Sequence, residues 1–326
     1  MVCPRRHSRV KISVQTTHWK RPAMRLPDGV LGMAGRGPDW EAWVTRLPGL
    51  ATGLFEEWGL TSDGWPMHGY CSLVVPVRTT EDEAAVLKIT FDGDEESEHE
   101  HLALRHWGGR GAVRLLRADP RRRALLLERL DHDDLTGLPD VEACEVVAGL
   151  YPRLHLPAPP QLRTVTSYVE RWLDPLAALP RDAPIPHRLV DQAVSLGRDL
   201  VADPASTGAL VHGDLHYFNV LASHREPWLV IDPKPMSGDP HYELAPMLWN
   251  RMDELDDVRP GVRRRFHALV DGAGLDEARA RDWVVLRMVL NAQWAVTDAE
   301  HADRRLTAEE RDWVTGCIAI VKAVQD

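Results

Sequence analysis

One polar segment in the second half of the chain restricts the possible fold more than any other feature. Residues 211–239 read VHGDLHYFNVLASHREPWLVIDPKPMSGD, in which Asp214 stands five positions before Asn219. Two short apolar stretches separated by a turn follow this pair, and the second stretch ends on Asp232. Apolar stretches separated by turn residues are typical of a β-hairpin. The pattern therefore predicts a polar loop, followed by a hairpin that brings a second carboxylate to the same place.

These three side chains are the ones that phosphoryl transfer needs. One carboxylate orients the attacking hydroxyl and accepts its proton, while oxygen ligands hold Mg²⁺ against the nucleotide phosphates. The spacing of Asp214 and Asn219 is that of the kinase catalytic loop, with His-Gly-Asp in place of the His-Arg-Asp of protein kinases. The alternative is a chance polar turn between buried strands, but chance does not account for the complete set at this spacing.

The motifs HGDLHxxN, IDPKP and GDPxYELA together resemble those of the aminoglycoside phosphotransferase-like kinases. They are most similar to the streptomycin 6-kinase and hydroxyurea phosphotransferase group, and the resemblance extends over roughly residues 40–326. It implies an α+β, bilobal, protein-kinase-like fold with a small β-rich N-lobe and a larger helical C-lobe. It also implies an ATP-dependent O-phosphotransferase that acts on a hydroxyl of a small molecule. An aminoglycoside-type antibiotic such as streptomycin is the favoured acceptor, and phosphorylation would inactivate it.

The resemblance gives each residue of the motif a role. Asp214 would be the catalytic residue that aligns the acceptor hydroxyl. Asn219 and Asp232 would hold Mg²⁺, and the phosphoryl donor would be ATP or GTP. Glu243 would brace the loop through backbone amides, at a place where Asp is commoner. Lys234 replaces part of the Asp-Phe-Gly of protein kinases, and the sequence does not define its role.

Lys88 is the candidate for holding the nucleotide phosphates. It lies inside the predicted strand 84–90, flanked by apolar residues, where an unpaired charge is costly. The resemblance implies contact with the α- and β-phosphates and pairing with a helix glutamate. It favours Glu100 as that partner, with Glu96 as the runner-up. A solvent-facing lysine on an alternating strand is the alternative.

Two predicted hairpins would complete the nucleotide site. The first, residues 71–77 and 84–90, would cover the phosphates, although the glycines before it do not form the GxGxxG of protein kinases. Gly69 would let the backbone approach a phosphate, or it is an ordinary hairpin glycine. The second hairpin ends in the segment that the resemblance identifies as the hinge, where the backbone of Glu128 and Leu130 would bind the nucleotide base.

The chain is expected to divide into three parts. Residues 1–38 are predicted to be a basic, disordered N-terminal extension, because the first 25 residues hold seven Lys or Arg and no acid. Residues 39–130 would form the N-lobe and residues 131–326 the helical C-lobe. The helices predicted from apolar periodicity are 39–47, 48–58, 141–154, 168–179, 185–201 and a final helix that begins with a capping box of Thr307 and Glu310.

Composition excludes several classes of protein. A net charge of −10 argues against nonspecific nucleic-acid binding and suits a cationic partner. No apolar run approaches the ~18 residues of a membrane span. The four cysteines are far apart and form no CxxC pair, which argues against zinc and disulfides and fits the reducing cytoplasm.

Carboxylates near the motif are candidates for binding a cationic acceptor. Asp253 and Glu254 belong to an acidic cluster that follows the motif, and a solvated helix end is the alternative for each of them. Asp239 would face the substrate or cap a turn, and the sequence favours neither.

Two other functions compete with antibiotic phosphorylation. One is a metabolic kinase acting on a sugar, a choline-like compound or an amino alcohol. The other is a nucleotide-binding pseudokinase, which the presence of Lys88, Asp214, Asn219 and Asp232 argues against. The sequence leaves open the acceptor hydroxyl, the choice of ATP or GTP, the role of resistance in physiology and the oligomeric state.

Overall fold

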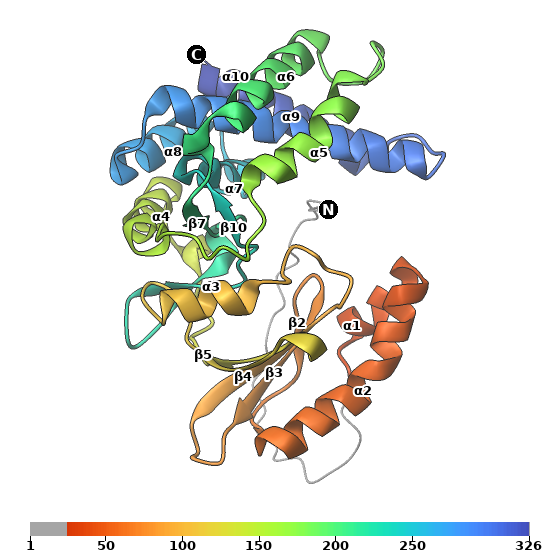
Figure 1. The fold of residues 1–326 in the computed structure, drawn as a ribbon, viewed down its shortest axis with the longest axis vertical. Helices are drawn as coiled ribbons and strands as arrows, with labels where there is room; N and C mark the ends of the chain where they lie inside the picture. Colours follow the sequence, from red (N-terminus) through yellow and green to blue (C-terminus); the bar gives the residue numbers. More distant parts are fainter. Residues whose placement is uncertain (1–24, 326) are drawn as a thin grey trace. The chain divides into compact units, whose positions relative to one another are not determined.

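The computed structural model describes residues 25–325. They form two compact units, residues 25–131 and residues 132–325. The first unit contains an antiparallel sheet and the helices α1 to α3, whereas the second is mainly helical (Figure 1). The composition of the two units agrees with the α+β architecture expected from the sequence.

The N-terminal unit is built on an antiparallel sheet in the order β1-β3-β4-β6-β5, with β2 paired to β3. In the central strand β4, Lys88 lies opposite Val74 of β3 and Leu125 of β6. Because β4 has a neighbour on each side, Lys88 stands on a fixed strand rather than at an edge. The strands are β1 (Thr61–Ser62), β2 (Met67–His68), β3 (Ser72–Arg78), β4 (Ala84–Thr90), β5 (Leu115–Asp119) and β6 (Ala124–Glu128).

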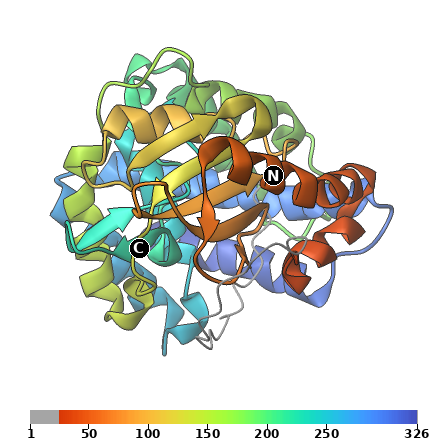
Figure 2. The same ribbon diagram turned by 90° about the horizontal axis from the view of Figure 1, so that it is seen from below.

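Helices cover both faces of this sheet. α1 (Asp28–Met33) and α2 (Pro38–Trp58) share one core with the alternate residues Leu87 and Ile89 of β4. Side chains alternate between faces along a strand, so Lys88 points to the other face, where it meets α3 (Glu100–Trp107). Figure 2 shows the sheet with α1 and α2, drawn in red, beside it.

The last part of the predicted N-terminal extension belongs to the folded N-terminal unit. Residues 1–24 lie outside the described residues, but the prediction of disorder is wrong for residues 25–38. Val30 and Met33 of α1 are buried in the core of the unit. α1 has only six residues, of which three are apolar, and such a short helix cannot be identified from apolar periodicity.

The prediction of two helices between residues 39 and 58 is also wrong. α2 is one continuous helix with Pro48 inside it. Proline removes one hydrogen bond and normally ends or kinks a helix. Here the buried stripe continues on both sides of Pro48, through Leu47, Ala51 and Leu54, so packing against the sheet outweighs the local loss.

The C-terminal unit surrounds two small strand pairs with helices. β7 (Ala209–Val211) pairs with β10 (Met236–Gly238), and β8 (Val220–Ala222) with β9 (Trp228–Val230) forms the hairpin that the sequence predicted. The helices are α4 (Asp140–Leu154), α5 (Val165–Ala177), α6 (His187–Ala202), α7 (Ala245–Trp249), α8 (Val258–Ala273), α9 (Glu277–His301) and α10 (Ala308–Gln325). The last helix begins with the predicted capping box, since Glu310 accepts from Thr307 N and Thr307 Oγ1 accepts from Glu310 N.

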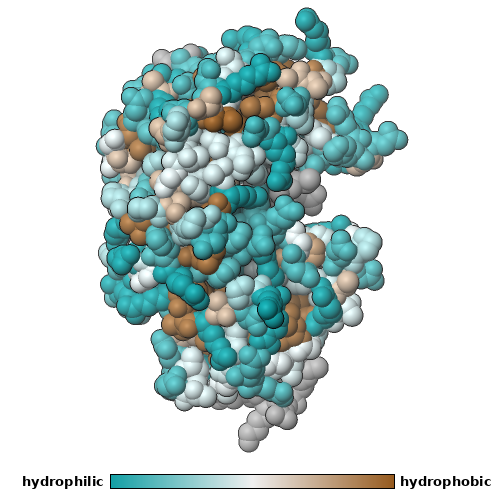
Figure 3. Space-filling view, viewed as in Figure 1, coloured by the Kyte–Doolittle hydropathy of each residue, from teal (hydrophilic) through white to brown (hydrophobic). Residues whose placement is uncertain are grey.

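α9 is the central helix of this unit. Its residues from Trp283 to Trp294 are all buried, so it is enclosed on every side instead of having one exposed face. None of the helices in residues 25–325 combines the length and the apolarity that crossing a membrane requires. The face in Figure 3 is mostly hydrophilic, with hydrophobic side chains in small separate groups.

Candidate active site

The candidate catalytic loop joins β7 to β8 in the C-terminal unit. β7 ends at Val211, the loop passes through Asp214, and the 3₁₀ turn η5 (Tyr217–Asn219) leads into β8. The Ile231 N–H donates to the Asn219 carbonyl at 2.9 Å, which fixes the end of β9 beside the loop. Strand pairing therefore brings the neighbourhoods of Asp214, Asn219 and Asp232 together.

Glu243 holds the backbone at the start of the loop. It lies in the turn η6 (Pro240–Leu244) and is fully buried. Its carboxylate accepts from the N–H groups of His212 at 3.0 Å and Gly213 at 2.7 Å. Burial alone raises the pKa of this carboxyl, but interactions with His155 and the Gly213 N–H outweigh burial and hold the pKa below its ordinary value. An ionised Glu243 thus acts as a brace for the loop.

The His212 ring is a neutral structural link. Its Nδ1 accepts from the Asp214 N–H at 3.3 Å, so the proton must be on Nε2, which lies 2.9 Å from the Ile231 carbonyl. Burial is the main cause of the lowered pKa of His212, which favours this neutral tautomer. One ring therefore ties the loop to the end of β9.

Only glycine fits the backbone conformation and the space at position 213. Its φ of +82° is a conformation that other residues rarely adopt, and an added Cβ would lie 2.3 Å from the Lys234 carbonyl oxygen. The Lys234 N–H in turn donates to the His212 carbonyl at 2.7 Å. The His-Gly-Asp sequence therefore reflects a close approach of the segment after β9 to the loop.

Asn219 and Asp232 have the properties of Mg²⁺ ligands. The Asn219 Nδ2 donates to the Asp214 carbonyl at 2.8 Å and lies 3.3 Å from His216 Nε2, so the amide nitrogen is occupied. No hydrogen bond to the Asn219 Oδ1 is found among the described residues. Mg²⁺ in kinases is bound through one or two protein oxygens together with phosphates and water. An Asn oxygen and an Asp carboxylate fit that ligand set.

The carboxylates that would act on ligands are partly exposed. The side chain of Asp214 is 16% exposed and that of Asp232 is 37% exposed, in contrast to the buried Glu243. Lys234 Nζ lies 3.1 Å from Asp232 Oδ1. Lys234, whose role the sequence did not define, thus offsets part of the charge of Asp232.

Asp239 caps a turn. It is 1% exposed and accepts from the N–H of His241, from the Trp283 indole at 2.7 Å and from Arg279 Nε at 2.5 Å. Of the two roles that the sequence left open, the structure shows the capping role, and burial leaves no surface of Asp239 for a substrate.

Asp253 and Glu254 are exposed in the turn η7 (Met252–Glu254). Glu254 pairs with Arg251 at 2.7 Å, and the Arg251 guanidinium lies 4.9 Å from the centre of the Tyr217 ring in η5. Arg251 therefore tethers the acidic turn to the turn that follows the catalytic loop.

In the N-terminal unit, Lys88 pairs with Glu100, the partner that the resemblance favoured. Lys88 Nζ lies 2.7 Å from both carboxylate oxygens of Glu100, and the two side chains are 9% and 3% exposed. A buried pair with this geometry holds the lysine in one position. The strand β4 and the helix α3 thus present one cation at a fixed place.

The other nucleotide candidates are turn and strand residues. The Gly69 N–H donates to the Ser72 carbonyl at 3.0 Å and closes the turn from β2 to β3. Glu128 accepts from the Arg114 N–H at 2.8 Å at the end of β6, and Leu130 is partly buried in the segment after it. Arg129, between them, donates to the carbonyl oxygens of Ala85 and Val77 and pairs with Asp63.

Sequence motifs did not identify Arg129 or Arg287 as functional residues. Arg129 locks the end of β6 to β4 and β3, and Arg287 of α9 contacts the catalytic loop. The one sign of Arg287 in the sequence is that it interrupts the apolar stretch Val284-Val285-Leu286. A buried partner for that charge could not be identified without the fold.

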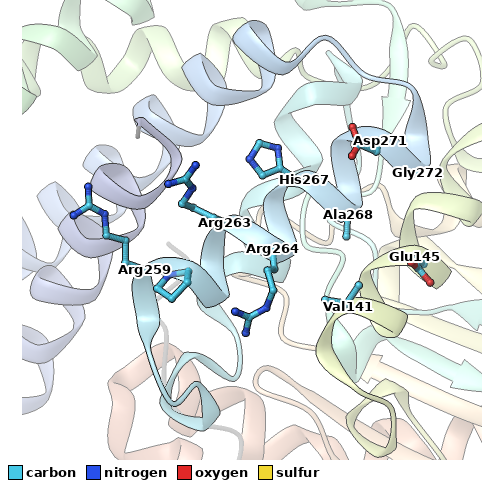
Figure 4. A pocket seen from close by; sticks show the side chains of 10 residues that line it. Val141, Glu145, Arg259, Arg263, Arg264, His267, Ala268, Asp271 and Gly272 are labelled. Atoms are coloured by element: carbon cyan, nitrogen blue, oxygen red, sulfur yellow. The ribbon is translucent and has the colours of Figure 1, made fainter.

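A cleft in the described part of the C-terminal unit lies away from the catalytic loop. It has a volume of about 810 Å³ and runs between α4 and α8, with Arg263, Arg264 and His267 on one side and Val141 and Glu145 on the other (Figure 4). None of its lining residues belongs to the catalytic loop or to η6. Its size alone therefore does not make it the catalytic centre.

Residues 57–299 match the family of aminoglycoside/hydroxyurea antibiotic resistance kinases. The chain is 42% identical over 274 residues to a streptomycin 6-kinase of Streptomyces glaucescens, covering 82% of this chain and 88% of the relative. It is 43% identical over 280 residues to a hydroxyurea phosphotransferase of Kitasatospora aureofaciens, covering 83% of this chain and 78% of the relative.

Solved structures show the same fold at lower identity. The crystal structure of aminoglycoside phosphotransferase APH(4)-Ia has a TM-score of 0.57 at 18% identity, covering 84% of this chain and 98% of that chain. Choline kinase LicA from Streptococcus pneumoniae also has a TM-score of 0.57, at 13% identity, covering 84% of this chain and 99% of that chain. The bilobal fold expected from the motifs is thereby confirmed. From its match over most of its length, the chain belongs to the aminoglycoside/hydroxyurea antibiotic resistance kinases and is a small-molecule phosphotransferase.

Proposed function

We propose that this kinase transfers the γ-phosphoryl group of ATP to a hydroxyl of a streptomycin-type aminoglycoside. The observation that carries the proposal is the state of the catalytic loop. Asp214 keeps a partly exposed carboxylate, while the backbone on both sides of it is bound by Glu243, His212 and Asn219. Such a carboxylate is held in place yet remains accessible to an acceptor.

In the proposed reaction Asp214 aligns the acceptor hydroxyl for in-line attack on the γ-phosphorus and accepts its proton. The new bond joins the acceptor oxygen to phosphorus, and the bond to the β-phosphate oxygen breaks, leaving ADP. Positioning contributes much of the rate, because the transition state of phosphoryl transfer is loose. This explains why the loop needs so many backbone contacts.

Lys88 would bind the α- and β-phosphates, with Glu100 fixing its direction. Asn219 and Asp232 would hold Mg²⁺, which when bound neutralises phosphate charge. The chain's own contribution is to fix this ammonium within the N-terminal unit and to hold these oxygens on the catalytic loop and the end of β9 in the C-terminal unit. The Lys88–Glu100 distance of 2.7 Å and the occupied Nδ2 of Asn219 support these two assignments.

The relatives suggest two acceptors, and the charges near the catalytic loop favour one of them. A streptomycin 6-kinase and a hydroxyurea phosphotransferase are almost equally similar to this chain, so their names alone do not separate the two substrates. The exposed Asp253 and Glu254, tethered to η5 through Arg251, favour a cationic acceptor over neutral hydroxyurea.

The test is nucleotide consumption by the purified protein with Mg²⁺ and a panel of acceptors. The panel contains streptomycin, other aminoglycosides, hydroxyurea, choline and simple amino alcohols, with mass spectrometry to identify any phosphorylated product. Asp214→Ala is measured beside the wild type. Asp271→Ala is the control, because it removes an exposed carboxylate from the cleft between α4 and α8.

We expect turnover with streptomycin that falls ~10²- to 10⁴-fold in Asp214→Ala, the range of general base catalysis, and stays at the wild-type level in Asp271→Ala. Nucleotide affinity should survive in Asp214→Ala, since the carboxylate acts on the acceptor. Turnover with choline or an amino alcohol, and none with streptomycin, would show a metabolic kinase instead. Nucleotide binding without turnover on any acceptor would contradict the proposal.

A further inference from the structure

Arg287 is a buried cation in the middle of the central helix α9. The residue is 6% exposed. Its Nη1 donates to the Tyr242 carbonyl at 2.9 Å, and its Nη2 donates to the Gly213 carbonyl at 2.5 Å. The guanidinium also lies 4.1 Å from the centre of the Tyr242 ring and 5.0 Å from that of Trp249. Among the residues that the structure describes, no carboxylate forms an ion pair with it.

A charge in this place needs an explanation. Burying a guanidinium without a carboxylate is unfavourable, and an apolar side chain would fill the same space among Leu286, Leu290 and Trp294. Aromatic faces and carbonyl oxygens offset part of the unfavourable free energy. What an apolar residue cannot supply is a rigid fork of donors, which here reaches two backbone carbonyls at once.

One of those carbonyls belongs to the peptide group that carries Asp214. The Gly213 carbonyl and the Asp214 N–H are two ends of the same planar unit. The N–H end is held by His212 Nδ1 at 3.3 Å, and the carbonyl end is held by Arg287. The orientation of that plane sets the direction in which the Asp214 side chain leaves the backbone.

Arg287 also completes the set of backbone partners around the loop. Glu243 binds the N–H groups of His212 and Gly213, the Lys234 N–H binds the His212 carbonyl, and Asn219 binds the Asp214 carbonyl. Without Arg287, the Gly213 carbonyl would lose the hydrogen bond from Nη2. The same guanidinium binds the carbonyl of Tyr242, the residue before Glu243. It therefore joins the loop to the turn that braces it.

We propose that Arg287 is a positioning residue, which aims the Asp214 carboxylate by holding the Gly213–Asp214 peptide group. The inference rests on the proposed function, in which Asp214 aligns the acceptor hydroxyl. Arg287 acts through Asp214 and touches no substrate. Its loss should therefore lower kcat and leave the KM for the nucleotide almost unchanged.

The variants are Arg287→Met, which keeps most of the stem and removes the charge, and Arg287→Lys, which keeps the charge but not the fork. The control is Arg281→Met on the same helix. Arg281 bonds the Val324 carbonyl and Glu277 and has no contact with the loop. Thermal unfolding of each variant separates a loss of folding from a loss of positioning.

Steady-state kinetics with the acceptor that the wild type uses give the first result. We expect Arg287→Met to lower kcat by ~10- to 100-fold, the effect of a misplaced catalytic group, with the KM for ATP changed less than about threefold. Arg287→Lys should recover part of the loss, and Arg281→Met should match the wild type. Equal kcat per folded molecule in Arg287→Met and wild type would overturn the inference.

A double-mutant cycle with Asp214→Asn distinguishes action through Asp214 from a separate structural effect. Once the carboxylate is gone, its aim no longer matters, so Arg287→Met should change the residual turnover by less than about threefold. A full additional loss of ~10-fold or more in the Asp214→Asn background would contradict the proposal.

Amide hydrogen exchange gives a readout that needs no acceptor. Arg287→Met should speed exchange in the peptide that covers residues 212–219, whereas Arg281→Met should not. Unchanged exchange there would overturn the positioning role even if the kinase is active. If the wild type shows no turnover but Arg287→Met still speeds exchange, the proposed function is refuted and the role of Arg287 in holding the loop is retained. The two failures are therefore distinguishable.

Discussion

At the scale of single residues, buried charges connect the elements around the candidate site. Asp239 shows how this works. It caps η6 through the His241 N–H and receives hydrogen bonds from Trp283 and Arg279, both on α9. Burial alone raises the pKa of Asp239, but hydrogen bonds from His241 and from the Trp283 indole lower it to about 2, from an ordinary value of 3.8. The ionised form of Asp239 therefore stabilises the fold.

The stability that Asp239 contributes should depend on pH in a defined direction. Its folded pKa lies below the unfolded value, so the contribution is complete above pH 3.8 and is lost as the pH falls toward 2. At neutral pH we expect Asp239→Asn to lower the free energy of unfolding by about 2 kcal/mol. Between pH 5 and pH 3 the difference from wild type should shrink by about 1 kcal/mol.

Urea unfolding at several pH values measures this change. The control is Asp256→Asn, which removes an exposed carboxylate. A difference between Asp239→Asn and wild type that stays constant from pH 5 to pH 3 would show that Asp239 stabilises the fold without a shifted pKa.

The residues that the sequence identified are those whose partners are close along the chain. Asp214, Asn219 and Asp232 lie within one loop and one hairpin, and Lys88 reaches Glu100 only 12 positions on. Arg287 is separated from its acceptor on Gly213 by 74 positions. Its place after an apolar stretch is the one local sign of burial, and no local pattern identifies its partner, because α9 packs against η6 only in the folded protein. Motifs thus reveal local constellations, and the fold is needed for the residues that hold them.

At the scale of elements, the packing of α5, α6 and α9 keeps Arg287 in place. Gly197 of α6 lies where these helices meet, and a Cβ there would be 2.4 Å from Leu173 Cδ2 of α5 and 3.2 Å from Leu286 Cδ1 of α9. Leu286 is the residue immediately before Arg287. Close contact at Gly197 therefore determines how near α9 can come to its neighbours.

Alanine substitutions at two helical glycines test this contact. Gly197→Ala should lower the free energy of unfolding by about 1–3 kcal/mol, because the methyl group overpacks the helix junction. Gly149→Ala on α4 is the matched control, since Gly149 is exposed and nothing lies within 4 Å of an added Cβ. There the better helix propensity of alanine should add about 0.5–1 kcal/mol. Equal effects of the two changes in urea unfolding would rule out close packing at Gly197.

The elements that the sequence predicted wrongly share a physical cause. Pro48 predicts a break in α2, but the buried stripe on both sides of it packs against the sheet and the helix continues. α1 was missed because six residues are too few to show a period, although Val30 and Met33 reach the core. In both places tertiary packing outweighs the local conformational preference. The strength of that packing cannot be predicted from residues that are neighbours in the sequence.

At the scale of the whole molecule, the charge balance bears on the choice of acceptor. A net charge of −10 creates a field that attracts cations, and salt screens such a field within about 8 Å at physiological ionic strength. This field should attract a cationic aminoglycoside, and it should not attract neutral hydroxyurea. The two acceptors suggested by the relatives therefore differ in their expected response to salt.

We expect the KM for streptomycin, at saturating ATP and Mg²⁺, to rise ~3- to 10-fold between about 0.02 M and 0.3 M NaCl, with kcat changed much less. The charge at η7 can be separated from the overall charge by two variants that each remove one exposed carboxylate. Asp253→Asn changes η7, and Asp271→Asn changes the cleft between α4 and α8. If η7 attracts the acceptor, Asp253→Asn weakens the salt dependence more than Asp271→Asn does. Equal weakening in the two variants would mean that the acceptor is attracted by the net charge of the whole molecule and not by η7. A KM that does not change with salt concentration would indicate an uncharged acceptor.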